Sequence, residues 1–209
     1  MLGRLIAVVL AVCLMLAGVI DSHPAGARNK KPGKSRTITR EFTSSNVPLV
    51  IPESGTLGLA APFPSAVEVG GFRKGKVLDV NLVLVGITHD GPVDIDLALV
   101  APGGRTAQVM SDVGGLATAT NVTLTLDDQA TNDIPALLES GTFRPTDRPG
   151  AGEELSDFDV GGAVSLATFN GLDPNGTWSI IVQDDQSDDS GSLSGWRLVI
   201  TAKVKSKKR

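Results

Sequence analysis

The chain has one cysteine, no tyrosine and only two histidines among its 209 residues. The cysteine, Cys13, and one histidine, His23, lie in residues 1–27, which we expect to be removed, so His89 would be the only histidine of the mature chain. Without cysteine, the mature chain can form neither a disulfide framework nor a zinc-thiolate site, and it has no thiol nucleophile. Such a protein must be stabilised by core burial, for which the remaining 182 residues suffice as one domain.

The first 27 residues have the organisation of a secretory signal. Met1 to Arg4 is basic, and the 16 residues from Leu5 to Ile20 are almost all apolar, which is short of the roughly 20 residues of a membrane span. Ala25-Gly26-Ala27 then supplies a small-x-small site for signal peptidase. We therefore predict a secreted, extracellular protein with no transmembrane segment after cleavage. An N-terminal membrane anchor is the alternative.

Charge is divided unevenly along the chain, and the net charge of −4 conceals this. Residues 28–40 carry six basic residues and residues 203–209 carry five, with no acid in either segment, whereas residues 41–202 hold 7 basic and 22 acidic residues, a net charge of −15. We predict a basic disordered linker at 28–42 and a basic tail at 203–209. Binding of an anionic envelope polymer or of lipid headgroups is the alternative. Because no basic patch falls on a predicted element, we expect no nucleic-acid binding.

Strand-like segments account for most of the remaining sequence. From Val77 to Val85, Leu78 and every second residue after it are apolar, which is the period-two pattern of a strand with one buried face. The other strands predicted before the last unit of the chain are 47–51, 63–69, 93–100, 105–110, 121–126 and 163–169. The turn-rich region 127–162 is expected to follow the surface, with one short helical turn at 134–139.

The C-terminal unit, residues 169–201, contains two further strands. Residues 177–183 and 195–204 both alternate, and Trp178 and Trp196 fall on the apolar faces, so both indoles should lie in a core. The 24 glycines and 12 prolines mark frequent chain reversals, and no segment shows sustained helical periodicity. About eight or nine short strands indicate an all-β fold, an antiparallel β-sandwich or jelly roll.

Several sequence blocks, in order along the chain, resemble the P domain, also called the P/Homo B domain, of proprotein convertases. His89 followed by residues 93–104, VDIDLALVAPGG, is similar to the signature H…DLxIxLxxPxG of that family. Residues 175–184 and 191–198 resemble its GxWxLxVxD and GxLxxW strands. Residues 122–128, 140–146 and 166–171 resemble blocks of the bacterial branch. The resemblance covers roughly residues 43–202.

The resemblance implies a jelly roll of the galactose-binding-domain-like kind at residues 43–202. In the family, this domain follows a subtilisin-like catalytic domain and supports the folding, stability and calcium dependence of the protease. Here only the basic segment 28–40 separates the predicted signal from the β-domain. We therefore expect a stand-alone bacterial form, and its role in stabilising a protease would require that the protease be a separate chain.

The residues do not form a recognisable catalytic pattern. A serine triad needs a histidine base, and His89, at the end of a predicted strand, has no G-x-S-x-G motif to accompany it. The expected role of His89 is a structural hydrogen bond. A glycosidase needs two carboxylates across a cleft lined by aromatic residues, and this chain has no tyrosine and has both tryptophans in predicted core positions. We predict a protein that is not an enzyme, with no catalytic or cofactor-binding residues.

The acidic loop 184–191 is the candidate metal site. Its four carboxylates, Asp184, Asp185, Asp188 and Asp189, and its backbone carbonyls suit Ca²⁺, which takes about six to eight oxygen ligands. Asp94 and Asp96 are two residues apart and face outward on the predicted strand 93–100, so they would complete the site if that strand ends beside the loop. A solvated acidic turn without metal is the alternative. Asp127 and Asp128 are a weaker second candidate.

Two functions are compatible with these features. The first is a secreted, non-catalytic, calcium-stabilised module whose partner is a secreted protease or a cell-surface component, as the resemblance implies. The second is a carbohydrate-binding or cell-surface adhesion module on the same jelly-roll scaffold, which would need an exposed, coplanar set of aromatic side chains.

Overall fold

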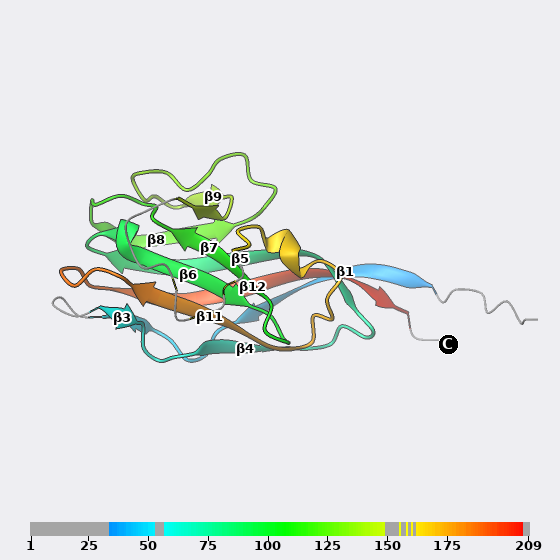
Figure 1. Cartoon of the computed structure of the whole chain (residues 1–209). Coiled ribbons are helices and arrows are strands. Elements are labelled where there is room, and N and C mark those ends of the chain that lie inside the picture. The colour runs from blue at the N-terminus through cyan, green and yellow to red at the C-terminus, as the bar shows by residue number, and fades with distance from the viewer. Residues whose placement is uncertain are drawn as a thin grey trace, which may run out of the picture. The chain divides into compact units, whose positions relative to one another are not determined.

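The computed structural model describes residues 34–52, 57–148, 155, 158, 160 and 162–206. The predicted signal, residues 28–33 of the predicted linker and residues 207–209 of the predicted tail lie outside these ranges. The described residues form strands and two short 3-10 helices (Figure 1). The strands are β1 (Ser35–Thr43), β2 (Leu49–Ile51), β3 (Gly58–Leu59), β4 (Ser65–Val69), β5 (Lys76–His89), β6 (Ile95–Val100), β7 (Thr106–Ser111), β8 (Ala119–Leu126), β9 (Gly141–Phe143), β10 (Thr146–Asp147), β11 (Gly176–Asp184) and β12 (Gly191–Lys205), and the helices are η1 (Pro92–Asp94) and η2 (Leu166–Phe169).

The strands form two sheets. In the first, the order is β1-β12-β5-β8-β9, and β2 also pairs with β12. In the second, the order is β10-β7-β6-β11-β3, and β4 also pairs with β11. Apolar side chains of both sheets belong to one core, which confirms the predicted all-β sandwich. The sheets are mixed rather than purely antiparallel, because β8 pairs with β9, and β7 with β10, in parallel.

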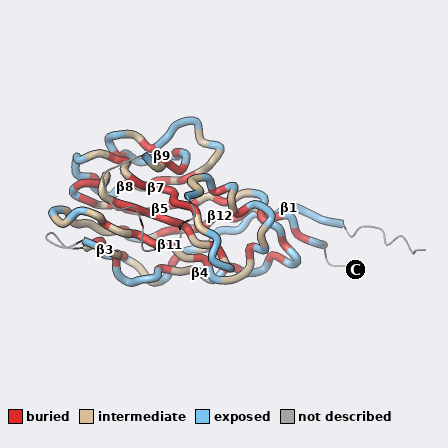
Figure 2. The backbone as a smooth tube through the Cα atoms, in the orientation of Figure 1, coloured by how far each residue is buried: buried red, intermediate tan, exposed pale blue. Residues whose placement is uncertain are grey.

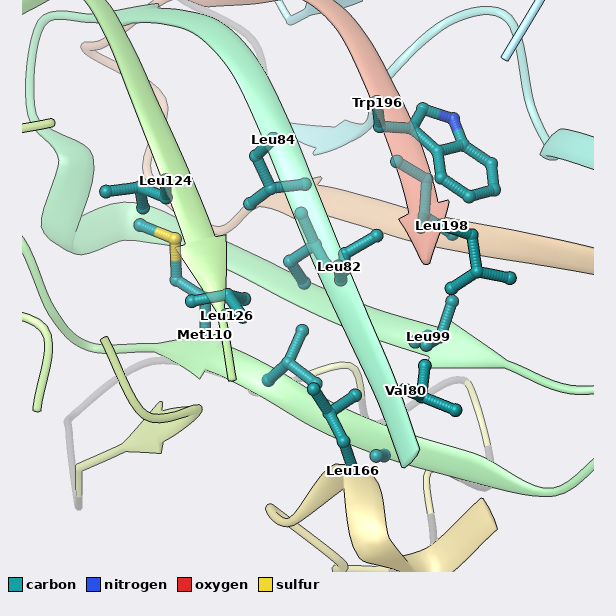
Figure 3. Close-up of a cluster of buried hydrophobic side chains, with 14 of the residues drawn as sticks. Val80, Leu82, Leu84, Leu99, Met110, Leu124, Leu126, Leu166, Trp196 and Leu198 are labelled. Atoms are coloured by element: carbon teal, nitrogen blue, oxygen red, sulfur yellow. The ribbon is translucent and has the colours of Figure 1, made fainter. Parts of the chain in front are cut away.

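The core lies between the two sheets. Figure 3 shows Leu82 and Leu84 of β5, Trp196 and Leu198 of β12, and Leu99 and Met110 of the second sheet among the buried side chains, and all six are fully buried. Both indole N–H groups find an acceptor inside the protein: Trp178 Nε1 donates to the Pro174 carbonyl at 2.9 Å and Trp196 Nε1 to Ser65 Oγ at 2.7 Å. The prediction that both tryptophans are core residues is confirmed.

The structure differs from the prediction in the number and position of some strands. The short strands β3, β9 and β10 were not predicted, and residues 163–169 form η2 rather than a strand. Asp128 accounts for this helix, because its Oδ1 accepts from Leu166 N at 3.0 Å and its Oδ2 accepts from Ala167 N at 2.7 Å. Residues 134–139 contain no helical turn. Ile134 N donates instead to Thr146 Oγ1, and Leu138 N to the Gly114 carbonyl.

One predicted inward-facing residue lies outside the core. Leu78 is 45% exposed, whereas its neighbour Val77 is 1% exposed. The pairing of β5 with β12 changes register between Thr201 and Ala202. An irregularity of this kind shifts the alternation by one residue, so Val77 faces inward in place of Leu78.

Both basic ends of the domain are partly structured, which corrects the predicted disordered linker and basic tail. Residues 35–42 of the predicted linker belong to β1, and residues 203–205 of the predicted tail belong to β12. β1 and β12 pair with each other in register from Ser35↔Lys205 to Thr43↔Arg197. Ile38 and Phe42 lie four residues apart and pack against the core, which anchors β1 despite its charges. In the described part of the chain, no helix is long and apolar enough to cross a membrane.

Candidate functional site

Two segments that are distant in sequence meet at one end of the sandwich. They are the end of β5 with η1, and the loop between β11 and β12 with the start of β12. Asp185 N donates to the Asp94 carbonyl at 3.1 Å, and Asp90 N donates to the Ser190 carbonyl at 3.2 Å. Gly191 pairs with His89 in the β5–β12 ladder. The loop that the sequence singled out is therefore held beside Asp94 by backbone hydrogen bonds.

His89 is buried under this loop and connects it to β5. Its side chain and that of Asp184 are both 0% exposed, and Nε2 lies 3.2 Å from Asp184 Oδ2. Nδ1 accepts a hydrogen bond from Gly91 N at 3.2 Å. An accepting Nδ1 places the imidazole proton on Nε2, which then donates to Asp184. The structural role expected for His89 is thus seen in its contacts.

Four carboxylates, Asp94, Asp184, Asp185 and Asp189, gather at this place, and we refer to them as the acidic cluster. The Asp94 and Asp189 side chains share a hydrogen bond. Gly91 lies directly below that pair, and a Cβ atom at this position would collide with Asp189 Oδ2 and crowd Asp94 Oδ2. Glycine at this position leaves room for the two carboxylates to approach the chain and each other, and a larger residue would displace them.

The electrostatics of the acidic cluster are those of like charges held together in a partly desolvated place. Burial, the hydrogen bond with Asp189 and the charges of Asp185, Asp189 and Asp184 raise the pKa of Asp94 from 3.8 to about 7. Burial also raises the pKa of Asp184, against the lowering effects of the Gln186 N–H and of His89. Burial and the charges of Asp112 and Asp184 raise the pKa of Asp185. In the described part of the chain, no lysine or arginine forms an ion pair with these carboxylates.

The structure does not bring all six predicted ligands together. Asp94 lies in η1 rather than on a strand, and Asp96, in β6, is opposite Gln183 of β11, whereas Asp184 is opposite Ile95. Because side chains alternate across a sheet, Asp96 and Asp184 point to opposite faces. The sequence had predicted that Asp94 and Asp96 share one face of a strand. This prediction is wrong, because Asp94 lies in η1. Asp188 is exposed in the loop.

Sequence reasoning missed two residues near the site. Asp112, which follows β7, raises the pKa of Asp185, and Asp90 accepts a hydrogen bond from Ser190 Oγ at 3.2 Å. The only signal for Asp112 was its position just after a strand and before Gly114-Gly115, which many turn residues share. Its proximity to the loop depends on the pairing of β6 with β7 and with β11, which sequence alone does not reveal.

The second candidate, Asp127 and Asp128, has a structural role. Asp128 caps η2 with both carboxylate oxygens and also accepts from Ser165 Oγ at 2.7 Å. Asp127 Oδ1 accepts from Gln129 N at 2.8 Å and its Oδ2 from Asn81 Nδ2 at 3.3 Å. These hydrogen bonds explain why the two acids follow β8.

The arrangement does not provide a nucleophile with its base. Both ring nitrogens of His89 are used by Asp184 and Gly91, so neither is left to accept a proton from a serine. Among the described residues, no three His, Cys, Asp or Glu side chains already converge as a group that could hold a metal ion. A cation at the acidic cluster would therefore need backbone carbonyl and water ligands beside the carboxylates.

Comparison with known proteins gives a family match in the C-terminal part of the chain. Residues 142–200 match the family model described as the proprotein convertase P-domain. This stretch includes most of β9, all of β10, η2 and β11, and most of β12. No curated protein matches the chain.

The solved structures that are similar to the chain include two from Aeromonas sobria. The serine protease of Aeromonas sobria has 14% sequence identity and a TM-score of 0.41. The complex of the Aeromonas sobria serine protease and the chaperone has 13% identity and a TM-score of 0.40. In both cases the similarity covers 83% of this chain and 28% of the other, so this chain spans well under half of their length.

Proposed function

We propose that the chain is a secreted, non-catalytic, protease-associated module stabilised by calcium, on the premise that residues 142–200 match the model of the proprotein convertase P-domain. The family is one of non-catalytic accessory domains. The observation that carries the calcium part of the proposal is the acidic cluster, in which carboxylates from η1 and from the β11–β12 loop are held together.

The residues of the acidic cluster fit a hard divalent cation. Carboxylate oxygens and loop carbonyls are the ligands that Ca²⁺ prefers, and the cluster is rich in both. The space over Gly91, which a Cβ atom would fill, is where the Asp94 and Asp189 carboxylates meet. Asp94, Asp184, Asp185 and Asp189 would hold the ion, and Asp188 would bind from the exposed side of the loop. Bound calcium would supply the positive charge that removes the repulsion between these side chains.

The fold suggests how calcium would stabilise the domain. The β11–β12 loop joins the second sheet to the first, and η1 leads from β5 of the first sheet into β6 of the second. A cation shared by Asp94 and the loop would therefore tie both crossings at one end of the sandwich. Loss of the cation would leave the same carboxylates to repel each other, and this end would open first.

Thermal unfolding of the full chain tests the calcium proposal. With Ca²⁺ at about 100 times its dissociation constant, binding stabilises the folded state by about 2.7 kcal/mol, and we expect a rise in Tm of about 5 to 10 °C over the protein in chelator. Mg²⁺ should give a smaller rise, because it dehydrates reluctantly. Equal shifts with both ions, or none with either, would contradict a calcium site.

Two variants and a control assign the effect to the acidic cluster. Asp94→Asn and Asp189→Asn each remove one carboxylate and should abolish most of the calcium-dependent rise in Tm. Asp133→Asn removes a carboxylate that is 52% exposed and paired with Arg144, in a different loop, and should keep the full rise. If all three variants respond alike, calcium binds elsewhere or only screens the net charge.

Protease association is tested with a subtilisin-like protease that lacks a P-domain of its own. If the chain acts as an accessory in trans, its addition with Ca²⁺ should lengthen the thermal half-life of the protease, and the chain alone should hydrolyse no peptide. An unchanged half-life would argue against stabilisation of a protease in trans. The carbohydrate-binding alternative has no specific support, because both tryptophans are fully buried.

A further inference from the structure

At the end of β1 and β12, the protein has a basic cleft that the proposed function does not use. The cleft has a volume of about 610 Å³, within the size range of ligand pockets. It is lined by Arg36 and Ile38 and Arg40 of β1, by Gly71 and Arg73 of the turn between β4 and β5, and by Val204, Lys205 and Ser206 at the end of β12. Four cationic residues and no acid line this cleft, in a domain whose residues 41–202 carry a net charge of −15.

The cleft lies where β1 and β12 of the first sheet extend past the other strands. Arg36, Ile38 and Arg40 are opposite Val204, Ala202 and Ile200 of β12, whose side chains are buried. They are therefore on the core-facing side of the sheet, at the end where β1 and β12 project beyond the other strands in Figure 1. Arg36 and Arg40 thus occupy positions where an apolar core residue would be expected. Figure 2 shows much of β1 as exposed.

The walls of the cleft are held in place by hydrogen bonds and by stacking. Asn175 fixes the backbone of Phe72, accepting from its N–H at 3.0 Å and donating to its carbonyl at 2.8 Å. The Arg40 guanidinium lies 5.9 Å from the centre of the Phe72 ring, a cation–π contact. Gly71 has φ of +86° and its missing side chain leaves room for Arg40, whose Cζ a Cβ atom would approach to 3.2 Å. This guanidinium is therefore positioned before any ligand arrives.

The remaining wall is tied to the end of β12. Lys205 N donates to the Arg73 carbonyl at 3.2 Å, and Ser206 N donates to the Lys34 carbonyl at 2.9 Å. Two arginines of the described residues form ion pairs, Arg144 with Asp133 and Arg197 with Glu41, and neither is a cation of the cleft. The positive charges of the cleft are thus not neutralised by carboxylates of the described chain.

The spacing of the cations indicates an extended ligand. Arg36 and Arg40 are four residues apart on one strand, a separation of about 13 Å between their Cα atoms. Side chains that stand perpendicular to the strand keep their guanidinium groups at a similar separation, which suits two separate negative groups better than one phosphate or carboxylate. Ile38 and Val204 place apolar surface between the cations. A ligand that fits would carry negative groups at intervals, with less polar groups between them.

The open edge of β1 favours a polypeptide over other polyanions. β1 is the end strand of its sheet, and in the described part of the chain it pairs only with β12. Its other edge therefore presents backbone N–H and C=O groups over nine residues. An extended peptide that adds to this edge has side chains at every second position on the cleft side, and acids four residues apart match Arg36 and Arg40.

We propose that the basic cleft and the free edge of β1 bind an acidic, extended segment of a partner polypeptide, which adds as a strand beside β1 while its carboxylates pair with Arg36, Arg40 and Arg73. Guanidinium groups pair with carboxylates through two parallel hydrogen bonds, which gives both affinity and register. This proposal does not depend on the calcium site, which involves no residue of the cleft.

Titration calorimetry with a defined peptide tests the proposal on the full chain. The probe is a peptide with the length of β1 in which threonine and glutamate alternate, and the matched probe replaces each glutamate with glutamine. We expect the acidic peptide to bind, with an affinity that falls as salt is added, and the glutamine peptide to bind at least about tenfold more weakly, which corresponds to about 1.4 kcal/mol.

Charge-reversal variants locate the binding surface. Arg36→Glu combined with Arg40→Glu should weaken binding of the acidic peptide by at least about tenfold. Lys76→Glu combined with Lys203→Glu makes the same change in net charge on a neighbouring pair of exposed, cross-strand lysines that do not line the cleft, and should leave binding nearly unchanged. Arg36→Ser is a milder variant should the double reversal unfold β1. Equal losses in both double variants would overturn the proposal, because only net charge would then matter.

Hydrogen exchange distinguishes strand addition from adsorption. Bound peptide should slow exchange of amides in β1, and binding without that protection would overturn strand addition. Binding of inorganic polyphosphate or of phosphatidylglycerol vesicles with the same arginine dependence, in the absence of peptide binding, would overturn the polypeptide partner. Self-association of the chain that the arginine reversals abolish would assign the cleft to a second copy. If no probe binds, the cations serve only to protect the edge strand from aggregation.

Discussion

Gly91, His89 and Asp94 illustrate how single residues organise the acidic end of the protein. His89 uses one nitrogen for Gly91 N and the other for Asp184, so it holds the turn after β5 against the end of β11. Gly91 leaves the space in which Asp94 and Asp189 meet. Burial and the neighbouring carboxylates then raise the pKa of Asp94 to about 7. Its protonation state therefore changes near neutral pH.

The raised pKa of Asp94 predicts a pH-dependent stability in chelator. Between about pH 4 and pH 7, folded Asp94 keeps a proton that the unfolded chain, with a pKa near 3.8, has lost. The folded state binds more protons in this range, so the free energy of unfolding contributed by this group falls as the pH rises. Chemical unfolding across this range should show the decline, and Asp94→Asn should flatten it.

Calcium should reverse part of this dependence. A cation favours the ionised form of Asp94 and removes the cost of ionisation, so the decline with rising pH should be smaller in Ca²⁺ than in chelator. Asp133→Asn, remote from the acidic cluster, is the control and should keep the wild-type slope. A stability that instead rises with pH in chelator, with the same slope in Asp94→Asn, would contradict the raised pKa.

At the scale of elements, the chain is least predictable where strands are short or charged. β5, β8, β11 and β12 each contain a clear period-two pattern and lie where the sequence predicts strands. β3 and β10 have two residues each, too few for any periodicity, and exist through their long-range partners β11 and β7. Ile38 and Phe42 are the only apolar residues of β1, so its composition resembles that of a linker. Its stability as a strand comes from β12.

The same limit applies to the candidate site. Asp94, Asp184, Asp185 and Asp189 could be predicted as neighbours because acidic turns at strand ends gather at one end of a sandwich. Asp96 could not be separated from Asp94 by sequence, because the 3-10 helix before β6 interrupts the alternation. Asp112 could not be added, because its proximity to Asp185 follows from the three-dimensional order of β7, β6 and β11.

The pairing of β1 with β12 predicts a large effect of one substitution and a small effect of another on the same strand. Phe42 packs against the core, with its ring 6.0 Å from that of Phe72, whereas Thr39 is exposed and only exchanges a hydrogen bond with Thr201 at 2.8 Å. Phe42→Ala should lower the free energy of unfolding by on the order of 2 kcal/mol. Thr39→Ala should change it by less than about 0.5 kcal/mol.

Urea unfolding of the two variants provides the measurement. If residues 35–43 were a disordered linker, both substitutions would be nearly neutral, so equal and small effects would contradict the strand. A large effect of Thr39→Ala alone would contradict the orientation of the two faces of β1.

At the scale of the whole molecule, acidic and basic groups are separated along β12. The acidic cluster lies before Gly191, where the strand begins, and the basic cleft includes Lys205, where it ends. Fifteen residues of strand separate the two by about 50 Å along the chain. At this distance the charges of one end do not neutralise those of the other, because screening in physiological salt acts over about 8 Å.

This separation predicts that simple salt stabilises the protein. Residues 41–202 carry a net charge of −15, and their repulsion opposes the compact state. In chelator, Tm should therefore rise as NaCl is added up to physiological ionic strength. CaCl₂ at the same ionic strength should raise Tm further if the acidic cluster binds the ion specifically. A Tm that falls with added NaCl would mean that attraction between opposite charges, rather than repulsion, dominates the balance.

The two buried tryptophans give the protein an internal optical reporter for each half of the sandwich. Trp178 is in β11 of the second sheet and Trp196 is in β12 of the first, and no tyrosine adds to their emission. Each indole is shielded from water and would emit at shorter wavelength in the folded protein than in the unfolded one. Variants that keep one tryptophan each would therefore report the two sheets separately. Coincident transitions would establish that the sheets separate in one cooperative step.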